Sequence, residues 1–179
     1  MLTTKTIGWK AASSMEEPRT QGQRWVLSTR EDTLDAVCKV TGTANRWISI
    51  FTPDLEEGIY DQDQFLDVAK RLVLAKRYAR IRVLISEPHR LVRNGHRFVT
   101  LGRRLNTYIE FRNVHEDFRD HREAFLIADK TALLYRVDAR RWEGIADTYE
   151  PAVAARYLKL FDEIWDMSQV EQELRELRI

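Results

Sequence analysis

The stretch DHREAFLIADK, residues 120–130, decides how the rest of the sequence is interpreted. A histidine and two acidic residues precede an unbroken apolar run, and Asp129 and Lys130 close it. A short apolar run bounded by polar residues is typical of a buried β-strand. TALLYRV, residues 131–137, is a similar run, so the two segments predict a strand pair that turns near residues 128–130.

Helical and strand-like segments alternate along the rest of the chain. The helices are indicated by N-capping residues and by apolar stripes at helical spacing, and the strands by short β-branched and aromatic runs. The alternation predicts an α/β fold, with a layered mixed β-sheet flanked by helices. The expected helices cover residues 28–42, 61–80, 89–105 and 150–177, and the further expected strands cover residues 46–53, 81–88 and 107–114.

Length and composition indicate one ordinary globular domain. The chain has 179 residues, of which 44% are hydrophobic and 32% are charged, as in soluble folded proteins. Residues 1–23 are rich in Thr, Ser, Gln and Glu, so we expect a flexible N-terminal arm or linker before a domain over residues 24–179. No apolar run approaches the roughly 20 residues of a membrane span and no secretory signal is recognisable, which predicts a cytoplasmic protein.

Composition also limits the possible binding functions. The 29 Lys and Arg residues against 28 Asp and Glu leave a net charge of +1, so a nucleic acid or an anionic lipid could be bound only through a local patch. Cys38 is the single cysteine, which excludes an intramolecular disulfide and a cysteine-based zinc site. The seven glycines form neither a dinucleotide-binding loop nor a Walker A loop. We therefore expect no cofactor.

The order of elements around His121 resembles that of the phospholipase D-like family. RWISIFTPDL, residues 46–55, is similar to the first strand of that family, and YLKLFDEIWDMS, residues 157–168, to its closing helix. HREAFLIADKTALLYR, residues 121–136, resembles the strand that carries the family motif His-x-Lys-x4-Asp. The resemblance covers residues 24–169, as a single half, and implies a phospholipase D-like fold with His121 at the position of the catalytic histidine.

Several polar residues depart from the family pattern. Glu123 stands at the position of the lysine, and Ala128 at that of the aspartate, with Asp129 one residue late. Because side chains alternate across a strand, this shift would turn Asp129 to the opposite face unless a bulge or turn intervenes. The Gly-Ser step is replaced by Tyr135 and Arg136. The family's phosphodiester chemistry needs a nucleophilic histidine, a second histidine as acid, and lysines that neutralise phosphoryl charge.

His121 is the candidate catalytic residue by its family position. The same sequence would also fit a histidine that caps a strand and pairs with Asp120 or Glu123 without catalysing a reaction. His115, His121 and the neighbouring acids could also form a metal site. The spacing of the two histidines matches no standard ligand motif, so we expect no metal.

The expected basic helix over residues 89–105 is the second candidate site. Wound at 3.6 residues per turn, four of its arginines fall on one side, opposite an apolar stripe. Arginine forks suit phosphate oxygens, so this side could bind a nucleic-acid backbone, a headgroup or an acidic partner, although a solvated surface has the same composition. The candidate ligand-binding residues are Arg90, Arg93, Arg97 and Arg104.

The family-like order of elements, combined with the missing lysine, predicts a catalytically inactive phospholipase D-like domain. We expect a binding or regulatory module for a phosphate-bearing ligand, a nucleic acid or a partner protein, acting as a homodimer or attached to another domain. The alternative is a phosphodiesterase or nuclease-like enzyme that uses His121 across a homodimer interface, because one chain carries only one such motif.

Overall fold

The structure is a computed structural model that describes residues 22–175. Its strands are β1 (Arg24–Leu27), β2 (Trp47–Thr52), β3 (Arg80–Ile85), β4 (Ile109–Asn113), β5 (Ala124–Ala128), β6 (Ala132–Arg136), β7 (Gly144–Asp147) and β8 (Gln169–Val170). Its helices are α1 (Arg30–Gly42), α2 (Glu57–Tyr60), α3 (Asp63–Ala75), α4 (His89–Asn94), α5 (Arg97–Arg104), α6 (Pro151–Met167) and α7 (Gln172–Arg175), with a 3-10 turn at Glu116–Phe118.

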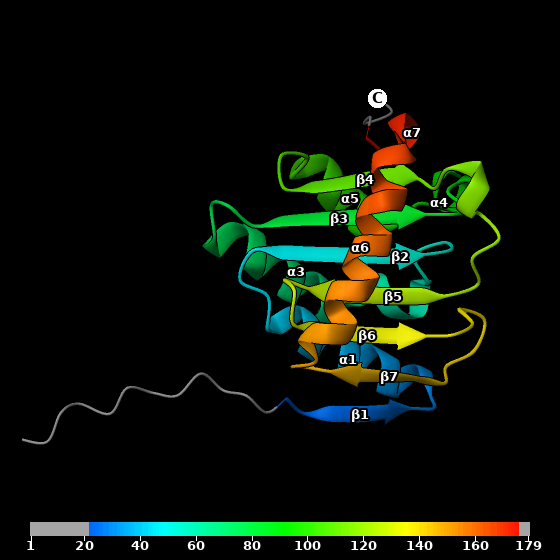
Figure 1. Ribbon diagram of the computed structural model, residues 1–179. Helices are drawn as coiled ribbons and strands as arrows, with labels where there is room; N and C mark the ends of the chain where they lie inside the picture. The colour runs from blue at the N-terminus through cyan, green and yellow to red at the C-terminus, as the bar shows by residue number, and fades with distance from the viewer. Residues whose placement is uncertain (1–21, 176–179) are drawn as a thin grey trace, which may run out of the picture.

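The strands form one eight-stranded mixed sheet in the order β1-β7-β6-β5-β2-β3-β4-β8. β2, β3 and β4 are parallel, and the other neighbours are antiparallel. α6 crosses one face of the sheet, and α1, α3 and α5 lie on the other (Figure 1). This architecture confirms the predicted α/β fold with a mixed sheet flanked by helices.

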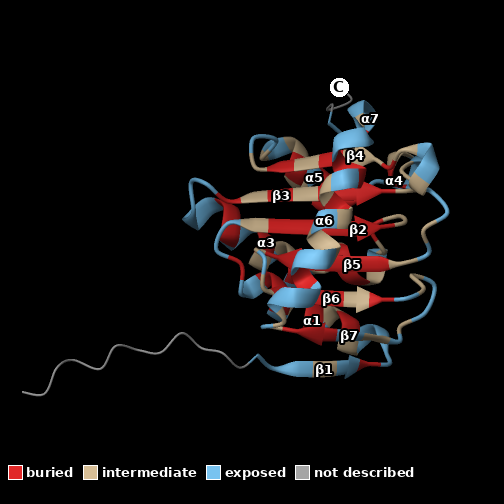
Figure 2. Cartoon of the chain, viewed as in Figure 1, coloured by how far each residue is buried: buried red, intermediate tan, exposed pale blue. Residues whose placement is uncertain are grey.

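The two faces of the sheet bury two separate hydrophobic clusters, and the central strands are buried along their length (Figure 2). Side chains of β5 alternate between the clusters, as the pleat requires. Leu126 belongs to the cluster under α1, α3 and α5, whereas Phe125 and Ile127 belong to the cluster under α6. The apolar run quoted above is therefore buried on both faces.

Local signals located α1 correctly. The Thr29 hydroxyl accepts a hydrogen bond from the Asp32 amide at 3.0 Å, and the Asp32 carboxylate accepts from the Thr29 amide at 3.0 Å. This reciprocal capping box fixes the start of a helix. The helix ends at Gly42, as expected.

Two of the expected helices are shorter than predicted. α3 ends at Ala75, so Tyr78 lies in the following turn and is 68% exposed, although the apolar stripe placed it inward. The expected basic helix is broken at Gly95, whose φ of 72° lies in the left-handed region that favours glycine. The break separates α4 from α5.

The two ends of the sheet also differ from the expectation. β1 and β7, which were not predicted, pair with each other at one edge. The long last helix stops at Met167, and the chain continues through β8 and α7. At this point the Ser168 hydroxyl donates to the Ile164 carbonyl at 2.6 Å and accepts from the His115 amide at 3.1 Å, which ties the helix end to the segment after β4.

Little of the expected N-terminal arm lies within the described residues. Residues 1–21 are outside them, but Gln23 exchanges hydrogen bonds with Thr148, donating to its hydroxyl at 2.8 Å and accepting from its amide at 3.1 Å. Pairing with the β7 side of the sheet therefore begins one residue before β1. No helix within residues 22–175 has the length and apolar character to cross a bilayer.

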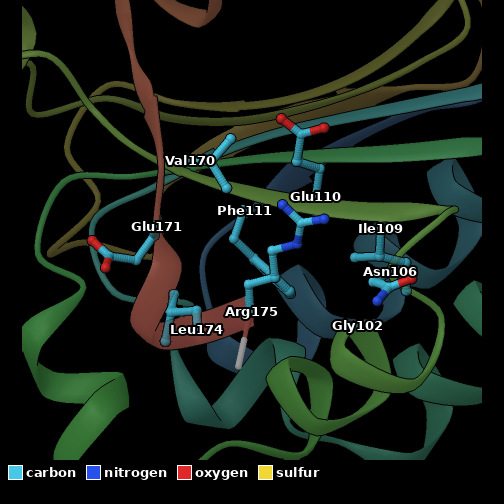
Figure 3. A pocket seen from close by; sticks show the side chains of 9 residues that line it. All are labelled: Gly102, Asn106, Ile109, Glu110, Phe111, Val170, Glu171, Leu174 and Arg175. Carbon is cyan, nitrogen blue, oxygen red and sulfur yellow. The ribbon is translucent and has the colours of Figure 1, made fainter. Parts of the chain in front are cut away.

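The C-terminal end of the described chain is held by Arg103. Its guanidinium donates to the carbonyls of Leu174 at 3.0 Å and Glu173 at 2.9 Å. A cavity of about 110 Å³ remains between α5, β4 and α7 (Figure 3). Beside it Gly102 lies directly against the Phe111 ring, where a β-carbon would overlap ring atoms, so glycine permits this close approach of α5 to β4.

Asp129 occupies the turn between β5 and β6, with a φ of 53°. Its carboxylate accepts hydrogen bonds from the backbone amides of Asn45 at 2.8 Å, Arg46 at 2.9 Å and Trp47 at 2.9 Å. Its own amide donates to the Trp47 carbonyl at 2.7 Å. The hairpin is thus fastened to the beginning of β2.

Replacing Asp129 should destabilise the domain. Hydrogen bonds to a charged group contribute roughly 1.5–3 kcal/mol each and are not additive, so we expect Asp129→Ala to lower the free energy of unfolding by about 3 kcal/mol. Asp129→Asn should lose less, since asparagine tolerates the left-handed region and still accepts from the amides. Urea unfolding measures both values. Asp67→Ala, at an exposed site on α3, is the control and should change the value by less than about 0.5 kcal/mol; equal values for Asp129→Ala and Asp67→Ala would contradict the tie.

His96 is a buried histidine at the start of α5. Its Nε2 lies 2.9 Å from the Leu55 carbonyl, which only accepts, so Nε2 carries the proton. Its Nδ1 accepts from the Phe98 amide at 3.2 Å. Both bonds require the neutral ring, and burial lowers the pKa of His96, although Asp61 and the Leu55 carbonyl act in the opposite direction.

The lowered pKa predicts a stability that falls in mild acid. The unfolded histidine, with a pKa of about 6.5, takes up its proton before the folded one. The contribution of His96 is therefore complete above that value and is lost as the pH falls toward the lower folded pKa. Urea unfolding between about pH 7.5 and 5 measures it, with His96→Gln as the non-titrating comparison. An identical pH dependence in the variant would disprove the assignment.

Candidate functional site

His121 lies at the end of the sheet where β2 and β3 finish, β5 begins and β6 ends, at the right of Figure 1. Its Nδ1 is 3.0 Å from a carboxylate oxygen of Glu123. The other oxygen of Glu123 accepts a hydrogen bond from the Tyr135 hydroxyl at 3.1 Å. One carboxylate thus joins His121 to Tyr135.

Aromatic rings surround this group. The His121 ring lies against Phe118, with ring centres 5.9 Å apart, and meets Phe51 edge-on at 6.2 Å. Tyr157 of α6 contacts Tyr135, with ring centres 4.6 Å apart. Burial raises the pKa of Tyr135, and the Tyr157 hydroxyl and the Glu123 carboxylate raise it further. Tyr135 therefore stays protonated near neutral pH and acts as a hydrogen-bond donor.

The pair of His121 and Glu123 has the geometry of an oriented histidine. A carboxylate that accepts from Nδ1–H leaves Nε2 with its lone pair, which is the arrangement of a general base or nucleophile. Nε2 has no hydrogen-bond partner among residues 22–175, where no lysine or arginine forms an ion pair with Glu123. Within residues 22–175 the site thus combines an oriented histidine with a carboxylate that no lysine or arginine pairs.

Arg136, at the position of the family serine, points to the other face of the sheet and is 2% exposed. Its guanidinium is paired with the Glu56 carboxylate and donates to the carbonyls of Ala139 at 3.2 Å and Arg141 at 2.9 Å. The indole of Trp142 lies 5.2 Å away. Burial raises the pKa of Glu56, and the charge of Arg136 opposes this rise. Arg136 is therefore a buried structural residue that holds the loop before α2 through Glu56.

Asp129 lies at the far end of β5 from His121. Six residues separate Glu123 from Asp129, about 20 Å along a strand. Asp129 lies in the turn after β5 and not in the strand. The alternation of side chains along β5 therefore does not decide the direction of its carboxylate. Its carboxylate is fully engaged by backbone amides, so its role in this structure is to hold the hairpin.

The candidate arginines lie on two helices, Arg90 and Arg93 on α4 and Arg97 and Arg104 on α5, which corrects the single-helix expectation. Arg90 pairs with Asp54 at 3.1 Å and with Glu87 at 3.6 Å. Arg97, beyond the break at Gly95, pairs with Asp61 at 3.1 Å and Asp63 at 2.5 Å. Among residues 22–175, Arg93 and Arg104 are exposed and form no ion pair. Carboxylates from the preceding loops thus neutralise half of the expected set.

The segment around His115 folds as a short turn. The His115 Nδ1 accepts a hydrogen bond from the Asp117 amide at 3.3 Å. In the part of the chain that the structure describes, no group of three or more His, Cys, Asp or Glu side chains is arranged to hold a metal ion. His115 and His121 are therefore not brought together as ligands.

Sequence reasoning missed the partners of Tyr135 and Arg136. Neither Tyr157 nor Glu56 is among the candidate site residues predicted from the sequence. Both contacts join residues far apart in the chain: 22 positions for Tyr135 and Tyr157, and 80 for Arg136 and Glu56. The register Phe125↔Tyr135, which turns Tyr135 toward α6, is the signal that could have suggested the first.

Comparison with solved structures identifies the fold. The structure is similar to that of TrmBL2, an archaeal chromatin protein, with a TM-score of 0.61 and 11% identity over 90% of this chain. This chain spans only 57% of the length of TrmBL2. It is also similar to the phospholipase D family member Nuc from Salmonella typhimurium, with a TM-score of 0.58, 15% identity, and coverage of 84% of this chain and 99% of that one.

NucT from Helicobacter pylori gives a TM-score of 0.55 and 11% identity, with the same coverage as Nuc. These likenesses confirm the phospholipase D-like fold. No curated protein matches the sequence. Residues 29–177 match the family described as Domain of unknown function (DUF7931), and because they make up most of the chain, the protein belongs to that family.

Proposed function

We propose that this protein is a catalytically inactive phospholipase D-like domain that serves as a binding or regulatory module. The observation that carries the proposal is the carboxylate of Glu123, which lies beside His121 at the position where the family has a lysine. The fold is phospholipase D-like, but Glu123 puts a negative charge where the phospholipase D-like family has the positive charge that holds a phosphate beside its histidine.

The charge reversal is large on the scale of a binding site. A unit charge about 4 Å from a phosphoryl oxygen contributes about 4 kcal/mol at an effective dielectric near 20, favourably for an ammonium and unfavourably for a carboxylate. His121 and Tyr135 each form a hydrogen bond with the Glu123 carboxylate, but these bonds do not reverse its negative charge. A phosphate-bearing ligand should therefore bind elsewhere on the domain.

The replacement of the Gly-Ser step supports the same conclusion. The Tyr135 ring lies against Tyr157 beside the histidine, where the family has its smallest residue. The Arg136 guanidinium is buried on the other face with Glu56. The Tyr135 hydroxyl is already engaged by Glu123 and the Arg136 guanidinium by Glu56, so neither is free for a phosphoryl group at His121.

The partner is part of this proposal. We propose that the domain works as a homodimer or attached to a neighbouring domain through residues 1–23, and that it acts in the cytoplasm. TrmBL2, which has a similar fold, is a chromatin protein that binds DNA. That likeness favours a nucleic acid among the phosphate-bearing partners.

A second function is favoured by the orientation of His121. With Nδ1 held by Glu123, its Nε2 is available as the nucleophile of a phosphodiesterase. A second histidine would have to come from another copy of the chain, across a homodimer interface. Glu123 would then orient the nucleophile, and the charge-neutralising residues would also come from the partner.

Phosphodiesterase assays separate the two functions. We expect the purified protein to release no nitrophenol from bis(p-nitrophenyl) phosphate and to leave DNA intact, because the Glu123 carboxylate beside His121 repels the charge on the phosphoryl oxygens. His121→Ala should behave in the same way as the wild type. The opposite result, turnover that is lost in His121→Ala and kept in His115→Ala, would establish the enzyme and reject the inactive domain.

Restoring the family lysine provides a test that does not depend on turnover. We expect Glu123→Lys to gain affinity for inorganic phosphate, because the substitution removes a repulsive charge and adds an attractive one. Phosphate at about 100 times its dissociation constant would stabilise the folded variant by about 2.7 kcal/mol, which thermal unfolding detects. The wild type should show no such shift, and Glu123→Gln serves as the neutral control. Strong stabilisation of the wild type by phosphate, lost in His121→Ala, would contradict the repulsive role of Glu123.

A further inference from the structure

A second charged region lies at the opposite end of the sheet from His121. Here the loops before β2, β3 and β4 meet the turn after β5, at the left of Figure 1. These three loops and the turn contribute exposed or half-exposed polar and aromatic side chains. We call its five cations the cationic strand edge: Arg46, Lys76, Arg77, Arg80 and Lys130.

Backbone hydrogen bonds hold the loops side by side. The Arg80 amide donates to the Arg46 carbonyl at 2.8 Å, and the Ile81 amide donates to the Tyr108 carbonyl at 2.7 Å. The turn that carries Lys130 is tied to Arg46 through Asp129. Because β4, β3, β2 and β5 are neighbours, the edge extends over three strand spacings, about 14 Å.

The cations of this edge are largely unneutralised. The bonds of Lys76 and Arg80 go to neutral oxygens, the side-chain oxygen of Asn45 and the carbonyls of Arg77 and Ala79. Within residues 22–175, none of the five cations forms an ion pair. Nearby carboxylates have their own partners: Asp162 pairs with Arg82 at 2.8 Å, Glu110 pairs with Arg112 at 2.7 Å, and Asp129 holds three amides. Asp166 is the remaining carboxylate beside the edge.

Aromatic rings are interleaved with these cations. Arg77 lies over Tyr78 at 5.9 Å, Arg80 over Tyr108 at 5.3 Å, and Arg82 over Trp47 at 5.1 Å. Tyr78 is 68% exposed, so most of its ring is accessible to a stacking partner.

Two hollows open beside Trp47 on the side of the sheet that α6 covers. Trp47 and Arg82 line both of them. Arg46 and Lys130 line the first, and Arg80 the second. Each hollow therefore combines an aromatic wall with at least one cation that has no carboxylate partner.

We propose that the cationic strand edge binds single-stranded nucleic acid. Lysines and arginines spaced along a groove follow a phosphate backbone, and exposed rings between them stack unpaired bases. Arg46, Arg80 and Lys130 contact phosphates, and Tyr78 stacks a base. A headgroup or an acidic peptide would use the cations but would gain nothing from the rings. This inference goes beyond the proposed function and does not depend on whether His121 is active, because the two regions lie at opposite ends of the strands.

Fluorescence anisotropy tests the proposal with a labelled thymidine oligonucleotide and a matching uridine oligonucleotide, each of about 20 nucleotides. The wild type should bind both with a salt-dependent affinity. Arg46→Ala combined with Lys130→Ala should reduce the slope of log K against log salt by about 1.4, which is about 0.7 for each lost phosphate contact. Tyr78→Ala should weaken binding at least about fivefold, the lower limit for a lost stacking contact.

Arg122→Ala combined with Arg141→Ala is the matched control, because it removes two exposed arginines without ion pairs at the His121 end of the sheet. Its affinity should equal that of the wild type. Absence of binding by the wild type at low salt would overturn the proposal. An equal loss of affinity in the control would also overturn it. The same holds if only Arg93→Ala combined with Arg97→Ala weakens binding, or if binding depends on Arg46 and Lys130 but not on Tyr78. None of these outcomes changes the result with bis(p-nitrophenyl) phosphate, so the two proposals fail separately.

Discussion

The Asp129 carboxylate fixes how the β5–β6 hairpin joins the parallel strands. By accepting three backbone amides at the start of β2, it sets the register in which Ile48 faces Ala128 and Phe51 faces Phe125. A slip of one residue would turn every side chain of β5 to the other face of the sheet. Both hydrophobic clusters, and the direction in which Glu123 points, therefore depend on this one turn.

The same register places the structural contact of Asp129 and the candidate site at His121 at opposite ends of β5. Asp129 holds one end of the strand, and Glu123 lies about 20 Å away at the other end, beside His121. The apolar residues between them are buried whatever charge is carried at position 123. The charge at position 123 therefore need not disturb the fold. This explains how a phospholipase D-like sheet can form with a carboxylate beside His121.

The sequence predicted the elements whose signals are local. The capping box of Thr29 and Asp32 and the apolar runs of β2, β3 and β5 lie within a few residues, so they could be recognised from one segment at a time. β1 and β7 are four residues each, too short for a periodic pattern, and are stabilised by pairing with each other. The partners of His121, Tyr135 and Arg136 include residues brought in by the sheet register and by α6, which no spacing rule supplies.

The partners of the charged residues could not be predicted for the same reason. Counting arginines along one segment favoured the residues of α4 and α5, but residues 34 to 36 positions earlier, Asp54, Asp61 and Asp63, lie against Arg90 and Arg97. The cations at residues 46, 76–80 and 130 are scattered in sequence and meet only because β2, β3 and β5 are neighbours. A net charge of +1 thus conceals one arginine-rich segment that is partly neutralised and one strand edge that is not. Local charge in this fold follows from strand order, because strand order decides which carboxylates lie within reach of each cation.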